Sequence, residues 1–334
     1  MAKKGKKGPK GKKGPVSTVD AQPNPGATKK AYDKEVSKHS RGKKSLEEIA
    51  NQPKTVRQKL RAQYDGVLNK VRFAADTVVY AVPTMVNNYR SARAVRNDPN
   101  MPITYVIKGM ANTRANQYRQ AKAFRKRGYA PVITKTEHGE ADDEKKYKSF
   151  KEQVKAFHQK ARIKKAETRY DGVTGHSSGG NDVCYIATQK DAKKLGIKFG
   201  QAVSHGYYGL PIDTFEQKFY TALMGSGIEN EDIKNSSKAR KIALKRMREK
   251  RPSMDLETIA GSRDLLVKAE HTFHPYATKL HVIDHPEADH WGTGGASLPV
   301  SEIKVDLYDA QRKRVMLKDK KAKHAASYQL QKAA

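Results

Sequence analysis

The segment Gly175-His176-Ser177-Ser178-Gly179 has the G-x-S-x-G spacing of a serine nucleophile held on a sharp turn. Gly175 and Gly179 permit such a turn because neither carries a Cβ atom that would collide with the neighbouring backbone. Centring the pattern on Ser178 would put His176 at a glycine position, so the spacing favours Ser177. The alternative is a glycine-rich turn without chemistry, and the choice depends on whether the chain supplies partners for the serine.

A nucleophilic serine needs an imidazole that takes its proton and a carboxylate that orients the imidazole. Asp264 follows the apolar run 256–260, and His290 follows the apolar run 279–283. If both runs are strands of a parallel sheet, these side chains gather with Ser177 at the carboxyl edge of that sheet. We therefore predict a triad of Ser177, Asp264 and His290. The competing interpretations are a helix cap for Asp264 and a surface-loop residue for His290.

The other histidines are weaker candidates. His285 lies closer to the end of the run 279–283 than His290 does and is its main competitor as the base. His205 is interpreted as a structural residue. No metal is expected, because metal-ligand spacing and an accompanying cysteine or carboxylate cluster are missing around the remaining candidates His271, His274 and His281.

Strands and helices alternate from residue 101 onward. Short apolar or β-branched runs bounded by turn residues predict strands at 103–107, 129–134, 170–173, 199–203, 256–260 and 279–283. Helical composition and spacing predict helices at 115–127 and 147–166. Such alternation implies right-handed crossovers. We therefore predict an α/β fold whose mostly parallel sheet has helices on both faces.

This chain order of nucleophile, acid and histidine on an α/β framework resembles the α/β-hydrolase family, and its lipase and esterase branch most closely. The resemblance covers roughly residues 101–310 and rests on GHSSGG at 175–180, GSRDLLV at 261–267 and DHWG at 289–292. It implies a serine hydrolase in which Ser177 is the nucleophile, His290 the general base and then acid, and Asp264 the orienting carboxylate. It implies no cofactor.

An oxyanion that forms during acyl transfer needs about two amide donors. The backbone N–H of Ser178, directly after the nucleophile, is the first expected donor. The second would be Met110, in the loop after Ile107, where the α/β-hydrolase family usually shows His-Gly and this sequence has Lys108-Gly109. Because a backbone amide does this work, loss of the histidine does not by itself abolish activity.

Four parts are predicted along the chain. Residues 1–44, rich in Lys, Gly and Pro, are expected to be a disordered basic tail. Residues 45–100 are expected to be a basic amphipathic helical segment. Its apolar side chains would pack on the main domain or, alternatively, dock on a membrane surface. The α/β-hydrolase-like catalytic domain spans 101–310 and contains a lid-like helical insertion at 207–251, and residues 311–334 form a basic C-terminal helix or tail.

The formal net charge of +32 predicts attraction to polyanions such as nucleic acid or anionic lipid. No base-reading motif favours nucleic acid. The single cysteine, Cys184, excludes an internal disulfide and fits a reducing compartment. No apolar signal-peptide region follows the basic N-terminus, and the most apolar run, 73–86, is too short to span a bilayer. We expect a cytoplasmic protein that is peripheral at a membrane if its basic segments bind lipid.

We interpret the sequence as a serine hydrolase that cleaves a carboxylic ester through an acyl-enzyme intermediate, with lipids among the candidate substrates. An acyltransferase would use the same triad. A third hypothesis treats the chain as a catalytically weak or inactive α/β-hydrolase scaffold that binds nucleic acid, or serves a structural role, through its basic tails.

Overall fold

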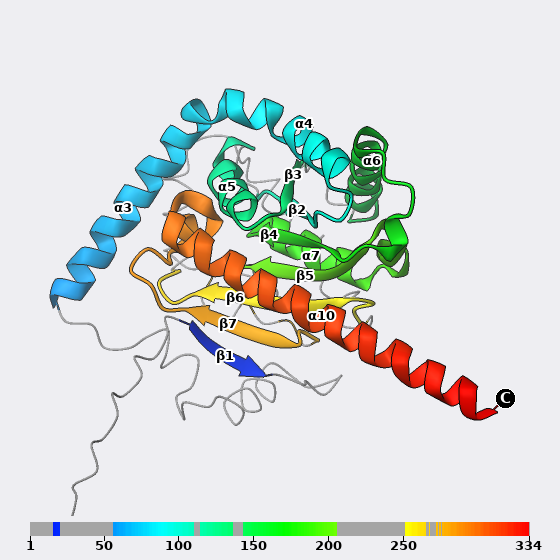
Figure 1. Ribbon diagram of the computed structural model, residues 1–334. Coiled ribbons are helices and arrows are strands. Elements are labelled where there is room, and N and C mark those ends of the chain that lie inside the picture. The colour runs from blue at the N-terminus through cyan, green and yellow to red at the C-terminus, as the bar shows by residue number, and fades with distance from the viewer. Residues whose placement is uncertain are drawn as a thin grey trace, which may run out of the picture.

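A seven-stranded sheet forms the centre of the protein, in the order β1-β7-β6-β5-β4-β2-β3 (Figure 1). The computed structural model describes residues 16–20, 56–109, 114–135, 143–205, 251–264, 267, 272, 274 and 276–333. From β7 to β3 the strands are parallel, and β1 pairs antiparallel with β7. The strands are β1 (Val16–Asp20), β2 (Ile103–Ile107), β3 (Ala130–Thr134), β4 (Asp171–His176), β5 (Ile197–Val203), β6 (Asp255–Gly261) and β7 (Lys279–Ile283).

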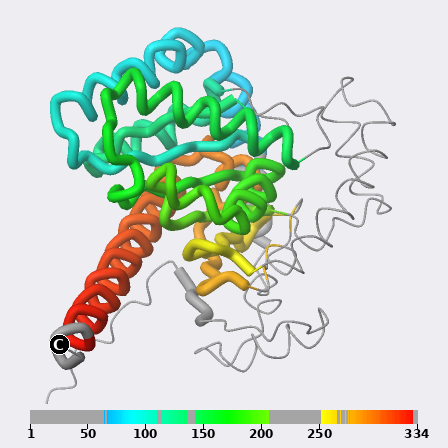
Figure 2. Tube along the Cα trace, turned by 90° about the vertical axis from the view of Figure 1, so that its right-hand side faces the viewer, coloured from blue at the N-terminus to red at the C-terminus, as the bar shows by residue number. Residues whose placement is uncertain are grey.

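Helices cover both faces of this sheet, as the sequence predicts (Figures 1 and 2). The apolar side chains of α4, α6 and α7 join one hydrophobic cluster, and those of α5 and α10 join another. The helices are α3 (Val56–Val79), α4 (Ala81–Asn97), α5 (Tyr118–Lys126), α6 (Asp143–Ala161), α7 (Ser178–Thr188) and α10 (Leu298–Ala333). Short helical turns are η1 (Ala115–Gln117), η2 (Ala166–Thr168), η3 (Lys190–Leu195) and η5 (Gly292–Ala296).

Strand β2 shows how the two clusters are filled. Successive side chains of a strand point to opposite faces of the sheet. Tyr105 and Ile107 pack in the cluster that α6 and α7 share, whereas Val106 packs with Phe124 and Tyr308 of α5 and α10. All five residues of β2 are buried. A strand buried on both faces reads as a continuous apolar run, which is why its bounds agree with the prediction from the sequence.

The five residues of β1 are a correction to the predicted basic tail. We expect residues 1–44 to be disordered, yet Val16–Asp20 forms a strand that pairs with Lys279–Ile283. Its sequence VSTVD is rich in β-branched residues, which favour an extended backbone. The rest of 1–44 lies outside the described residues, as do residues 45–55 and all of the predicted lid-like insertion except Arg251.

A second correction concerns the apolar residues of α3. The two alternatives are packing on the main domain and docking on a membrane surface, and the exposure of Tyr64, Val67 and Val71 contradicts the first for these three residues. The inner face of α3 buries Asn69, Phe73 and Asp76. Helical periodicity identifies an apolar face, but it does not say which way that face points.

The outer edge of β3 is closed by side-chain amides. Asn88 accepts a hydrogen bond from Ile133 N at 2.9 Å and donates one to Ile133 O at 2.9 Å. Gln153 of α6 makes the same two contacts with Lys135, at 2.7 and 2.9 Å. The carbonyl of Pro131 accepts from the side chains of Asn87 and Ser91. α4 and α6 therefore take the place of a further strand.

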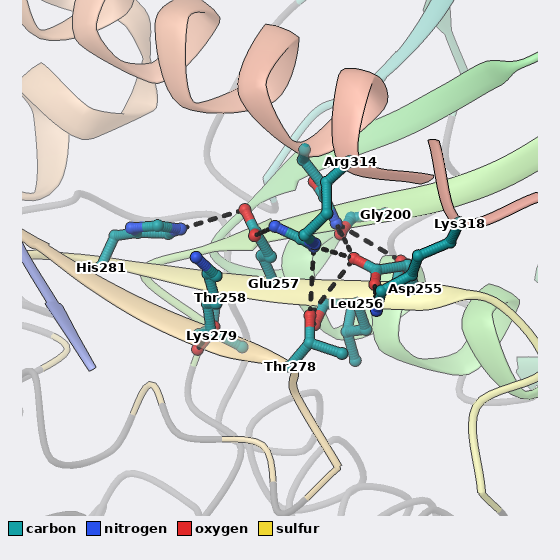
Figure 3. A network of polar contacts seen from close by, with 11 residues as sticks. Gly200, Asp255, Leu256, Glu257, Thr258, Thr278, Lys279, His281, Arg314 and Lys318 are labelled. Carbon is teal, nitrogen blue, oxygen red and sulfur yellow. Dashed lines mark hydrogen bonds and ion pairs between the residues drawn. The ribbon is translucent and has the colours of Figure 1, made fainter. Parts of the chain in front are cut away.

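Helix α10 is tied to β6 and β7 by a buried polar network (Figure 3). The guanidinium of Arg314 donates to the carboxylates of Asp255 and Glu257. Glu257 also lies 3.0 Å from Nε2 of His281 on β7. Burial raises the pKa of Glu257, but the hydrogen bonds from His281 and Arg314 outweigh it and hold the pKa below its usual value. The end of α10 extends beyond the sheet in both views (Figure 2).

Candidate active site

The turn between β4 and α7 carries Ser177 in a strained conformation. Its φ of 56° and ψ of −123° lie where residues with a Cβ atom are rarely found. A Cβ atom on Gly175 would lie 2.2 Å from the carbonyl oxygen of Gly179, and one on Gly179 would lie 2.5 Å from that of Lys108. Both positions therefore require glycine, as the G-x-S-x-G spacing predicts.

The turn lies at the point in the sheet where the direction of the strand order reverses. Strand β4 pairs with β2 on one side and with β5 on the other. From β2 the chain continues outward to β3, and from β5 it continues in the other direction to β6 and β7. A crevice forms at the carboxyl ends of the strands at such a switch point, and ligands of open α/β sheets bind there.

Asp264 and His290 meet at this carboxyl edge. Oδ2 of Asp264 lies 2.9 Å from Nδ1 of His290, and Oδ1 accepts from the backbone N–H of Val267 at 2.8 Å. The Asp264 side chain is fully buried, whereas 12% of the His290 side chain is exposed. The carboxylate fixes one ring nitrogen of His290, so the other, Nε2, is the one available to a substrate or to a serine.

His290 lies close to the turn that carries Ser177. The ring of His176, the residue before Ser177, lies 4.5 Å from the ring of His290, measured between centroids. Among the described residues, no hydrogen bond joins Ser177 to His290. Catalytic hydrogen bonds are often long in unliganded enzymes and shorten when substrate binds.

The competing histidines make other contacts. Nδ1 of His285 accepts a hydrogen bond from the backbone N–H of Glu287 at 3.1 Å, within its own turn. His205 is buried, with Nδ1 3.9 Å from Sγ of Cys184. Burial raises the pKa of the Cys184 thiol well above its usual value. Among the described residues, no group of three or more His, Cys, Asp or Glu side chains could hold a metal ion.

The expected oxyanion donors are only partly within the described residues. Ser178 is the first residue of α7, so its backbone N–H is free of intrahelical partners. Met110 lies outside the described residues. Lys108, in the position of the family's usual histidine, is half-buried, and partial burial together with the nearby Arg114 holds its pKa below the usual value. Two cationic side chains therefore flank this loop.

A polar network behind His290 was not visible in the sequence. Oγ1 of Thr293 lies 3.4 Å from Nε2 of His176, and it donates to the carbonyl oxygen of His290 at 3.1 Å. The carbonyl of Thr293 accepts from Nζ of the fully buried Lys304, at 2.6 Å. Burial, with His290 and Lys304 nearby, holds the pKa of His176 well below its usual value, so this ring is neutral.

Helix α3 supports the loop that carries His290. Asn69 donates to Oδ1 of Asp289 at 3.2 Å, and Phe73 lies 4.8 Å from Trp291 between ring centroids. Burial raises the pKa of Asp289 to about 6 against the hydrogen bonds from the Gly292 N–H and Asn69. The sequence gives no signal for these contacts, because more than 200 residues separate Asn69 from Asp289.

A small pocket opens to solvent beside the end of β2. Its walls include Ile107, Tyr147 and Phe150, and its polar side chains include Lys146 and Asp182. Burial raises the pKa of Asp182 to about 6, although Lys146 opposes this shift. Ser177 does not line the pocket, which therefore lies next to the turn and not on the nucleophile.

No protein-family model matches this sequence, and no curated protein matches it. Among solved structures it is similar to several esterases and to a lipase-esterase related protein. A Pyrococcus furiosus esterase is 20% identical over 65% of this chain and 83% of its own, with a TM-score of 0.46. A Rhizomucor miehei esterase is 13% identical over 65% of this chain and 76% of its own, with a TM-score of 0.45. Esterase B of Lactobacillus rhamnosis is 12% identical over 69% of this chain and 82% of its own, with a TM-score of 0.47.

Similarities as distant as these carry no argument about activity. The fold itself, with a parallel sheet covered by helices on both faces, is the predicted α/β class. Among the helices of the described residues, none is long and apolar enough to cross a bilayer.

Proposed function

We propose that this protein is a serine hydrolase that cleaves carboxylic esters, with Ser177 as nucleophile, His290 as general base and Asp264 as the orienting carboxylate. One observation carries the proposal. A strained serine on a glycine-flanked turn and a buried carboxylate–histidine pair at 2.9 Å lie at the same edge of one sheet. The combination of these two features at a switch point is what a serine hydrolase needs.

The chemistry follows from these positions. Oγ of Ser177 attacks the ester carbonyl while Nε2 of His290 takes its proton. Asp264 holds the other ring nitrogen and stabilises the imidazolium. The N–H of Ser178, with Met110 as a second expected donor, would bind the oxyanion. His290 then gives its proton to the leaving alcohol, and a water molecule, activated by His290, releases the carboxylic acid from Ser177. Lipid esters are a candidate substrate class, and an alcohol acceptor in place of water would make the reaction an acyl transfer.

Labelling with a fluorophosphonate tests the nucleophile. Wild type should be labelled and should hydrolyse a soluble short-chain ester, whereas Ser177→Ala should lose labelling and at least about 10⁴-fold of its turnover. Ser149→Ala on α6 is the control and should keep both, because Ser149 lies outside the proposed site. Labelling that persists in Ser177→Ala, or folded wild type that is not labelled, would remove the catalytic proposal and favour a non-catalytic scaffold.

A further inference from the structure

The exposed apolar side chains of this protein are concentrated on one pair of helices. Nine of the twelve exposed large hydrophobic side chains of the described residues lie between Tyr64 and Tyr89. Six of them surround the junction of α3 and α4 and define what we name the α3–α4 apolar face: Val78, Val79, Val82, Met85, Val86 and Tyr89. Val78 and Met85 are 79% and 77% exposed. A contiguous apolar patch of this kind marks an interaction site.

The side of this helix pair that faces the molecule is held by both polar and apolar contacts. It buries the polar residues Asp76, Thr84, Asn87 and Ser91 together with the apolar residues Phe73, Ala92 and Val95. Asp76 binds Arg119 of α5 at 2.8 Å, and Asn87 donates to the carbonyl of Pro131 at 2.9 Å. The buried side therefore attaches both helices to the main domain. The apolar residues opposite have no such role in the described part of the fold.

Charge identifies the partner. Between Arg72 and Arg90, Asp76 is the only Asp, Glu, Lys or Arg residue, and its side chain is buried. Beyond the apolar face, α4 exposes three arginines, Arg90, Arg93 and Arg96. An apolar helix surface bordered by cations matches the interface of an anionic bilayer, where the apolar groups enter the acyl boundary and the cations meet phosphate.

The shape and the total charge also favour a membrane over a second copy of the chain. Helices α3 and α4 form an arch over the molecule, and their junction is at the outer side of that arch (Figure 1). A convex surface can enter a bilayer, whereas helix pairing needs a straight seam. With a formal net charge of +32, two copies repel each other and an anionic surface attracts each copy.

We propose that the α3–α4 apolar face docks on an anionic lipid bilayer. Helix α3 carries part of the docking surface, and it also supports the His290 loop of the candidate active site through Asn69 and Phe73. The docking does not depend on the proposed hydrolase activity. Ser177→Ala should therefore bind vesicles as wild type does, so failure of one proposal is distinguishable from failure of the other.

Co-sedimentation of the full chain with vesicles provides the first test. Wild type should bind phosphatidylcholine vesicles that contain phosphatidylserine much more strongly than phosphatidylcholine alone. Val78→Glu with Met85→Glu should weaken this binding at least tenfold. The matched control, Leu317→Glu with Tyr328→Glu on α10, changes the charge equally at exposed apolar positions and should leave binding within about twofold. Equal loss in both pairs would assign the binding to overall charge and overturn the proposal.

Site-specific labelling provides the second test. Cys184, the single cysteine, is buried, so Met85→Cys can be labelled selectively with an environment-sensitive fluorophore. Its emission should shift to the blue when phosphatidylserine vesicles are added, and the same label on Leu317→Cys should not respond. No shift at Met85→Cys would overturn the proposal. So would a wild-type dimer in light scattering that Val78→Glu with Met85→Glu converts to a monomer, because the face would then be a self-association interface.

Discussion

Glu257–His281 and Asp264–His290 each join a carboxylate from the β6 side to a histidine from the β7 side, at 3.0 and 2.9 Å. Glu257 lies within β6, and its second oxygen is held by Arg314 (Figure 3). Asp264 lies beyond the end of β6, and its second oxygen accepts a hydrogen bond from the backbone N–H of Val267. His281 is enclosed between strands, whereas His290 lies beside the turn of Ser177.

A short carboxylate–histidine distance therefore does not by itself identify a catalytic pair. The first pair neutralises its charge with a permanent cation and joins α10 to the sheet. In the second pair, the cation from the same helix is Lys304, which holds the carbonyl of Thr293 and not the carboxylate. An imidazole that accepts and returns a proton needs a carboxylate that orients it and stabilises the imidazolium.

The largest expected effect separates the two pairs by activity. Asp264→Asn should lower ester turnover by about 10⁴-fold, because the amide favours the wrong tautomer of His290. Glu257→Gln makes the same chemical change in the other pair and should leave the turnover of folded protein within a few-fold of wild type. Turnover of a short-chain ester, measured where circular dichroism shows both variants folded, provides the comparison. A similar loss in both variants would contradict the division of roles.

A smaller effect separates the pairs by stability. Arg314→Met leaves the carboxylates of Asp255 and Glu257 without their main cation, and should lower the free energy of unfolding by about 3–5 kcal/mol. Lys313→Met, on the same helix, removes an exposed ion pair with Asp309 and should cost less than about 1 kcal/mol. Urea denaturation measures both. Equal losses would show that the network does not hold α10 in place.

The smallest effect depends on pH and sharpens the contrast between the two cations. Burial lowers the pKa of Lys304 from 10.5 to about 7. Between these values the unfolded chain binds more protons than the folded protein, so the stability from this group rises with pH. From pH 7 to 8.5 the rise should be roughly 1–2 kcal/mol. Urea denaturation of Lys304→Met should lack this rise, and the exposed Lys321→Met should keep it. The same dependence of stability on pH in wild type, Lys304→Met and Lys321→Met would contradict the prediction.

The sequence predicts most of the fold but only the outline of the candidate site. Runs such as 103–107 are apolar because both faces of the strand are buried, so their position is visible without the structure. The turn at Ser177 is visible because only glycine fits beside it. The pairing of Glu257 with His281 depends on the register between β6 and β7, which the apolar pattern of the sequence does not specify. The outward direction of Tyr64 and Val67 depends on which polar groups the main domain offers to α3.

The amide contacts along β3 also bear on how this protein avoids aggregation. An uncovered edge strand offers a row of free N–H and C=O groups to which another chain can add a strand. At Pro131, Ile133 and Lys135 those groups are already bonded to side chains of α4 and α6, and Pro131 has no N–H to offer. Asn88→Ala would free both backbone groups of Ile133 at once. That change would open the middle of the edge, between the contacts that still hold Pro131 and Lys135.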